Sequence, residues 1–145
     1  MTTGIEFTKA APQAAAAMFG LERYLRSSGL EASLLNLVRL RASQINGCAY
    51  CLDMHSKEAR AAGEAEQRIY VLDAWREAPF YSARERAALA WAEALTALPS
   101  RAPDEADYEA LKPHFDDAGI ATLTMTVAVV NALNRLGVGL LPELP

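Results

Sequence analysis

Alanine and leucine dominate the apolar residues of this chain, and that imbalance argues for helices. Of the 75 hydrophobic residues among 145, 29 are Ala and 19 are Leu, whereas Val and Ile together contribute 10. Ala and Leu lose little side-chain freedom in a helix, whereas β-branched residues lose χ1 freedom there. The buried strands of a parallel sheet would read as Val- and Ile-rich runs. We therefore expect an all-α fold, and the length fits one domain over residues 1–145.

Turn signals divide the chain into segments that read at helical period and predict six or seven helices. Two Ser-x-x-Glu pairs, Ser28 with Glu31 and Ser82 with Glu85, fit capping boxes and predict helices starting near Glu31 and Ala83. The stretch from Pro99 to Pro103 is expected to be a loop.

The segment from Ile120 to Leu133 is apolar around most of a helix. A helix of this kind is buried on more than one side, either in a bundle core or at a subunit interface. Three Thr and one Asn interrupt the segment, and it is too short to cross a hydrocarbon core of roughly 30 Å. We therefore expect a homo-oligomer and no membrane span.

The charges exclude some classes of partner. The chain has 14 basic and 18 acidic residues and a net charge of −4, and its cations are scattered along the sequence. The sequence therefore shows no cluster of basic residues of the kind that binds nucleic acid or an anionic membrane surface. The first residues carry Glu6 and Lys9 and do not contain a basic region followed by an apolar run. We therefore expect no signal peptide, and we expect the protein to be cytoplasmic.

The segment with the most chemical information contains the two cysteines of the chain, Cys48 and Cys51, followed by His55. An Asn-Gly turn at residues 46–47 precedes good helix-forming sequence, so Cys48 is expected in the first turn of a new helix. At 100° per residue, Cys51 lies about 60° and His55 about 20° from Cys48 around the helix, so the three side chains share one narrow face.

Several kinds of site could use this face. A structural zinc site would need a fourth ligand, and only the distant His114 could supply it. A haem attachment site would need His directly after the second cysteine, where the chain has Leu52. Two thiols buried as small hydrophobes remain possible. A redox-active dithiol fits best, because the helix N-terminus and the histidine favour thiolate and the sulfurs are close enough to form a disulfide. No metal or cofactor is expected.

The pattern Cys48-x-x-Cys51-x-x-x-His55, preceded by the segment 37–47, closely resembles the alkylhydroperoxidase AhpD core of the carboxymuconolactone decarboxylase superfamily. Further matching segments include 53–57, 74–80, 85–95 and 131–135, so the resemblance spans about residues 30–136. It implies an all-α fold of antiparallel helices that assembles into trimers or hexamers, with thiol peroxidase activity.

The resemblance also implies a role for each motif residue. Cys51 would attack the peroxide, Cys48 would close the disulfide, and His55 would transfer protons. Helix geometry supports this order, because His55 is about 6 Å of axial rise from Cys51 and about 10.5 Å from Cys48. The helix dipole alone would instead make Cys48 the more acidic thiol, because it lies nearer the N-terminus.

One position departs from the family pattern. The proton relay usually includes a Glu twelve residues before the first cysteine, and this chain has Asn36 there. An amide cannot accept and return a proton at neutral pH, so turnover is expected to be weak. Glu93 is one carboxylate that could replace it from another helix, although a Glu on an amphipathic helix is more often simply solvated. Trp75 and Trp91 are expected to fill core or interface volume.

These observations predict an enzyme that reduces an organic hydroperoxide or hydrogen peroxide. An external dithiol reductant is required, because the chain has no third cysteine to reduce a Cys48–Cys51 disulfide. A redox sensor or disulfide-exchange module without efficient turnover is the alternative. A lactone decarboxylase is disfavoured, because those members of the superfamily generally lack the cysteine pair.

Overall fold

The computed structural model describes residues 3–140 and residue 144, and these contain helices and no strand. Five helices are long and three are one turn each, together with one 3₁₀ segment. The short helices take the number of α-helices above the six or seven expected. In chain order they are α1 (Phe7–Ala10), α2 (Pro12–Arg26), α3 (Ala32–Asn46), α4 (Ala49–Ala61), α5 (Glu66–Tyr70), η1 (Leu72–Ala74), α6 (Ala83–Thr96), α7 (Glu105–Glu109) and α8 (Asp117–Gly139).

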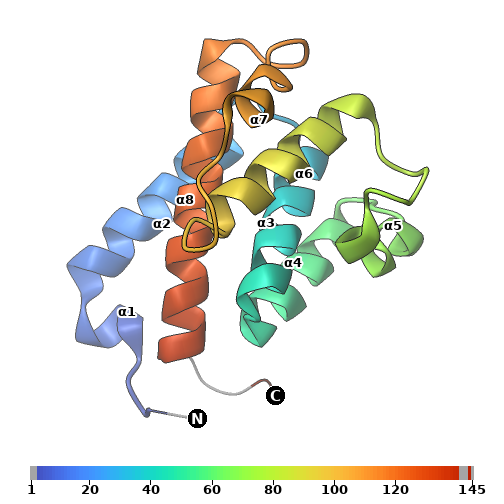
Figure 1. Ribbon diagram of the computed structural model, residues 1–145. Coiled ribbons are helices and arrows are strands. Elements are labelled where there is room, and N and C mark those ends of the chain that lie inside the picture. The colour runs from blue at the N-terminus through green and yellow to red at the C-terminus, as the bar shows by residue number, and fades with distance from the viewer. Residues whose placement is uncertain (1–2, 141–143, 145) are drawn as a thin grey trace.

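Two helices lie at the centre of the bundle (Figure 1). Helix α3 packs against α4, α6 and α8, and α8 packs in addition against α2, α4 and α6. The colour ramp in Figure 1 shows α2 and α8 running in opposite directions, as expected for an antiparallel bundle. The fold class predicted from the Ala- and Leu-rich composition is therefore confirmed.

The core forms two clusters that share α3 and α6. One lies toward α8, and its largest members are Leu34, Val38, Leu111, Phe115, Ile120, Leu123 and Val127. The other lies toward α4 and η1, and consists of Leu37, Leu40, Ala59, Leu72, Trp75, Tyr81 and Leu89. Trp75 is buried and Trp91 packs against the first cluster, so both tryptophans fill core volume as predicted.

One of the two predicted capping boxes is present. Ser82 caps α6 and exchanges hydrogen bonds with Glu85, as the sequence predicted. The predicted box of Ser28 with Glu31 is wrong, although α3 does begin beside Glu31. The Ser28 hydroxyl instead donates to the carbonyl oxygen of Leu25 at 2.6 Å. The reason is that Ser28 still belongs to the turn that ends α2, where the last carbonyl groups lack helical partners.

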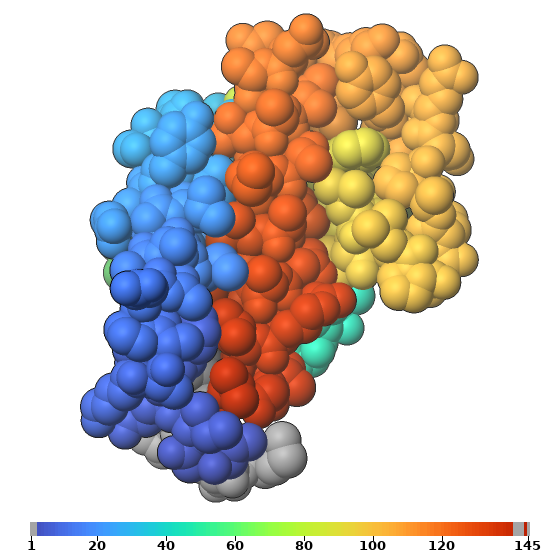
Figure 2. All heavy atoms as spheres, turned by 90° about the vertical axis from the view of Figure 1, so that its left-hand side faces the viewer, coloured from blue at the N-terminus to red at the C-terminus, as the bar shows by residue number. Residues whose placement is uncertain are grey.

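Helix α8 is longer than the apolar segment from which it was predicted. Its 23 residues are long and apolar enough, by length and composition alone, to span a membrane, which the shorter segment was not. In the structure it is one of the two central helices and packs against α2, α3, α4 and α6. Figure 2 shows a strip of α8 left uncovered between α2 on one side and α6 with the chain that follows it on the other. Within α8, Ala121, Met125 and Ala128 are exposed.

Candidate functional site

The two cysteines lie where α3 gives way to α4. Gly47 ends α3 with a left-handed φ of 65°, which glycine adopts without strain. Cys48 is then the N-cap of α4, and Cys51 lies in its first turn. Their Cα atoms are 5.3 Å apart, and their sulfurs form a disulfide, as the spacing had suggested. The Cys48 sulfur also accepts a hydrogen bond from the Cys51 backbone N–H at 3.3 Å.

Helix α8 fixes the position of this turn. The side-chain amide of Asn46 donates to the Oδ1 atoms of both Asn131 and Asn134 at 2.9 Å. Asn134 is buried and in turn donates to the hydroxyl of Ser43 at 2.9 Å. The two α8 asparagines belong to the segments that carried the family resemblance, and the structure shows that they hold the residues just before the disulfide.

His55 lies one turn after Cys51 on α4 and is 1% exposed. Its Nδ1 atom lies 3.2 Å from Oε2 of Glu58, and its buried Nε2 atom has no hydrogen-bond partner. Burial lowers the pKa of His55, and this effect outweighs the opposing attraction of Glu58. The imidazole is therefore held neutral at neutral pH, with one nitrogen free.

Glu58 is held in its ionised form. Burial alone would raise its pKa, but the hydrogen bond with His55 and the charge of Arg26 outweigh burial and hold the pKa below its usual value. Nη2 of Arg26 donates to both carboxylate oxygens of Glu58 at 3.2 Å.

A buried ion pair lies beside the histidine. Arg39 of α3 is 1% exposed, and its Nη2 atom lies 3.2 Å from Oε2 of Glu22 on α2. Burial lowers the pKa of Arg39, and the facing carboxylate of Glu22 opposes that shift. The Nε and Nη2 atoms of Arg39 and the Oε1 atom of Glu22 are buried and have no hydrogen-bond partner, so the contact between the two side chains is an ion pair only. Four charged side chains from three helices thus surround His55.

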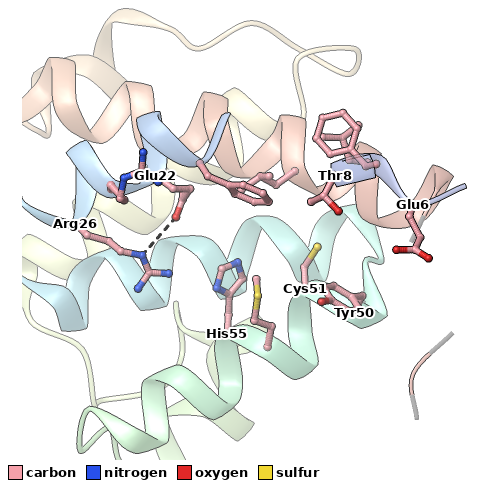
Figure 3. Close-up of a pocket in the computed structure, with 13 residues that line it drawn as sticks. Glu6, Thr8, Glu22, Arg26, Tyr50, Cys51 and His55 are labelled. Atoms are coloured by element: carbon pink, nitrogen blue, oxygen red, sulfur yellow. Dashed lines mark ion pairs between the residues drawn. The ribbon is translucent and has the colours of Figure 1, made fainter. Parts of the chain in front are cut away.

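Cys51 and His55 line a cavity of about 570 Å³ between α4, the two N-terminal helices and α8. Figure 3 shows the two side chains on one face of α4, with Glu22 and Arg26 of α2 across from them. Most of the wall is apolar, and its apolar members are Phe7, Phe19, Tyr50, Met54, Leu133 and Leu136. Cys48 is fully buried and is not among the lining residues, so only one sulfur of the disulfide faces the cavity.

Neither of the two positions considered from the sequence, Asn36 and Glu93, supplies a carboxylate to the cavity of Cys51. Asn36 is buried in α3 and lines a separate cavity of about 260 Å³ together with Ala59, Gly63 and Arg68. Glu93 accepts hydrogen bonds from Arg41, Trp75 and Arg76. Burial would raise its pKa, but these hydrogen bonds outweigh burial and lower it. Glu93 is thus the centre of an ion-pair cluster and does not line the cavity of Cys51.

The other polar residues considered near the motif have simpler places. Tyr50 lines the cavity, and Asp53 pairs with Lys57 at 2.7 Å on the exposed side of α4. His114 lines a different cavity, beside the start of α8. Within residues 3–140 and 144, no three His, Cys, Asp or Glu side chains are grouped so that they could hold a metal ion.

Sequence reasoning missed the charged residues around His55. Glu58 could have been found, because a residue three positions after His55 lies on the same helix face. Glu22 and Arg39 carry no such signal, because their pairing depends on how α2 packs on α3.

Comparison with known proteins places this architecture in a family. Residues 12–94 match the model of the carboxymuconolactone decarboxylase family. The uncharacterized protein YdfG of Bacillus subtilis (strain 168) is 38% identical over 141 residues, which cover 97% of this chain and 95% of that protein.

Two solved structures share the fold. One, from Agrobacterium tumefaciens, is of a protein of unknown function described as a candidate AhpD antioxidant defence protein; it is 42% identical with a TM-score of 0.93, and the match covers 97% of each chain. The other is an uncharacterized peroxidase-related protein from Silicibacter sp. TM1040, 28% identical with a TM-score of 0.77 over 88% of this chain and 69% of that one. The chain therefore belongs to the carboxymuconolactone decarboxylase family and has the AhpD-like fold.

Proposed function

We propose that this protein is a thiol-dependent peroxidase that reduces organic hydroperoxides. The observation that carries the proposal is a disulfide in which Cys51 faces an apolar cavity that is also lined by His55, whose buried Nε2 atom has no hydrogen-bond partner. The descriptions of the Agrobacterium and Silicibacter proteins as antioxidant and peroxidase-related agree with it.

The chemistry begins from the reduced dithiol. The Cys51 thiolate attacks the outer oxygen of ROOH, the O–O bond breaks, and Cys51 becomes a sulfenic acid while RO⁻ takes a proton and leaves as alcohol. The Cys48 thiol then condenses with the sulfenic acid, forming the disulfide and releasing water. An external dithiol reduces the disulfide by thiol exchange and is itself oxidised to a disulfide.

The cavity favours an organic substrate over hydrogen peroxide. Hydrogen peroxide is a small polar molecule that gains little from an apolar wall, whereas burying an alkyl or aryl group releases about 25 cal/mol per Å² of apolar surface. A cavity of about 570 Å³ has room for such a group next to Cys51. We therefore expect a lower KM for cumene hydroperoxide than for hydrogen peroxide.

Single cysteine variants test the roles of the two sulfurs. Cys51→Ser is expected to abolish peroxide reactivity, whereas Cys48→Ser leaves a sulfenic acid on Cys51 that dimedone traps and mass spectrometry locates. Cys48 is buried away from the cavity, which is why the label should not appear on it. Dimedone on Cys48 in the Cys51→Ser protein, with none on Cys51 in the other variant, would reverse the roles.

Steady-state turnover separates the enzyme from a redox sensor. Peroxide consumption by the wild-type protein is measured with a panel of dithiol reductants in excess. An enzyme consumes many equivalents of peroxide per chain, whereas a sensor stops at one. If every reductant gave only stoichiometric oxidation, the peroxidase proposal would be rejected in favour of a redox sensor.

We also propose that the protein is a homo-oligomer, a trimer or hexamer in keeping with its family. Exposed residues of α8 support this, because Ala121, Met125 and Ala128 recur at helical spacing, Met125 is 44% exposed, and the two alanines allow close approach.

A further inference from the structure

Glu58 gives His55 a fixed hydrogen-bond partner from within the same helix. Its Oε2 atom lies 3.2 Å from Nδ1 of His55, and its side chain is 32% exposed, whereas that of His55 is 2% exposed. The carboxylate therefore connects a buried imidazole to the solvent.

The charge state of Glu58 determines which nitrogen of His55 carries the proton. An ionised carboxylate can only accept hydrogen bonds. Glu58 is ionised because Arg26 contacts both of its oxygens. Nδ1 of His55 must then be the donor, and the lone pair of the neutral ring lies on Nε2. That atom is buried, has no partner and belongs to a residue that lines the cavity beside Cys51.

The other charged groups facing His55 cannot take this role. Arg39 and Arg26 are cations, and Arg39 opposes protonation of the ring. Glu22 faces the same region, but one of its oxygens is paired with Arg39 and it forms no hydrogen bond with His55. Glu93 does not line this cavity and is held elsewhere by Arg41, Trp75 and Arg76.

We propose that Glu58 positions His55 for proton transfer, in the role that Asn36 cannot fill. The inference rests on the proposed peroxidase function. In the reduced protein, Nε2 accepts the proton of the Cys51 thiol, and the resulting imidazolium is stabilised by the Glu58 carboxylate on Nδ1–H. After the O–O bond breaks, Nε2–H returns the proton to RO⁻, so the ring ends neutral and no proton or electron is gained or lost by His55.

The first test needs no turnover. NMR of the oxidised protein with ¹⁵N-labelled histidine reports the tautomer and pKa of His55, and His114, the other histidine of the chain, is an internal reference. In wild type the Nδ1–H tautomer is expected. Glu58→Gln should lower the pKa of His55 and reduce the share of the Nδ1–H tautomer, because the amide carries no charge and can donate to Nδ1.

The second test measures the rate constant for cumene hydroperoxide against pH. We expect Glu58→Gln to lower it by about 10²-fold, at the lower end of the range for a positioned acid–base group, and to move the ionisation assigned to His55. Glu58→Asp should restore part of the rate constant and part of the wild-type ionisation of His55. Asp53→Asn is the matched control, since it neutralises a carboxylate on the same helix that pairs with Lys57, and it should change neither.

The NMR and rate measurements distinguish a failure of the proposed peroxidase function from a failure of the positioning role of Glu58. A wild-type protein without peroxide turnover would end the proposed function, while the NMR result would still decide the contact between Glu58 and His55. If Glu58→Gln leaves the tautomer and pKa of His55 as in wild type, or leaves the rate profile unchanged in an active enzyme, the positioning role is wrong.

Discussion

The pair formed by Glu22 and Arg39 offers a quantitative test of what holds the site together. Arg39 is among the largest fully buried side chains, and the side chain of Glu22 retains 11% exposure. Glu22→Gln keeps the shape of the side chain and removes the charge. It leaves a guanidinium buried without its nearest compensating carboxylate, 3.2 Å away in the wild type.

Removing one partner of a buried ion pair costs about 3–5 kcal/mol. We expect a value near the lower end, about 3 kcal/mol, because the charge of Glu58 also acts on Arg39. With a urea m-value of about 2 kcal/mol/M, the unfolding midpoint should fall by roughly 1.5 M without a change in slope. The comparison is made at one protein concentration, because assembly contributes to apparent stability.

Two further variants make the experiment decisive. Glu6→Gln is the matched control, since Glu6 lines the same cavity but its ion pair with Lys9 is exposed, and its midpoint should not move. Glu22→Gln combined with Arg39→Met should cost less than the sum of the single changes, because the uncompensated charge is gone. A loss below about 0.5 kcal/mol in Glu22→Gln would refute the reasoning, because that is the size of an ordinary surface effect.

Acid should destabilise the protein through the same cluster. The pKa values of His55 and Glu58 in the folded protein lie below their ordinary values of 6.5 and 4.5. The unfolded chain therefore binds more protons than the folded one, and the free energy of unfolding falls as the pH drops below about 6.5 for His55 and below about 4.5 for Glu58. Each group lowers it by at most about 1.4 kcal/mol per pH unit. His55→Asn should flatten the first part of a plot of urea midpoint against pH, and an unchanged slope would contradict the assignment. Sedimentation of the wild type at micromolar concentration should show a homo-oligomer, and Met125→Glu should shift it toward smaller species, because a charge would then be buried at the interface; a wild-type monomer would contradict this.

Much of the fold could be predicted from local patterns in the sequence. The Ala and Leu content, the Asn-Gly turn and the Ser82 capping box act over a few residues, and the structure shows the helices and the cap where these signals lie. The shared face of Cys51 and His55 follows from helical spacing alone, whereas Cys48 is the extended N-cap before the first helical residue and does not line the same cavity. The Ser28 box failed because the same local pattern also fits the end of the preceding helix, and only the path of the chain through Gly29 decides between them.

The surroundings of the site were decided by tertiary packing. Asn46 meets Asn131 and Asn134, and Arg39 meets Glu22, because α3 lies against α8 and close to α2, and nothing in the spacing of these residues records that contact. The cavity arises in the same way, from three parts of the chain that are distant in sequence: the N-terminal helices, α4 and α8. Local periodicity determines which side of a helix a residue occupies. Which residue it faces, how deeply it is buried and therefore how readily it ionises depend on the helices packed against that side.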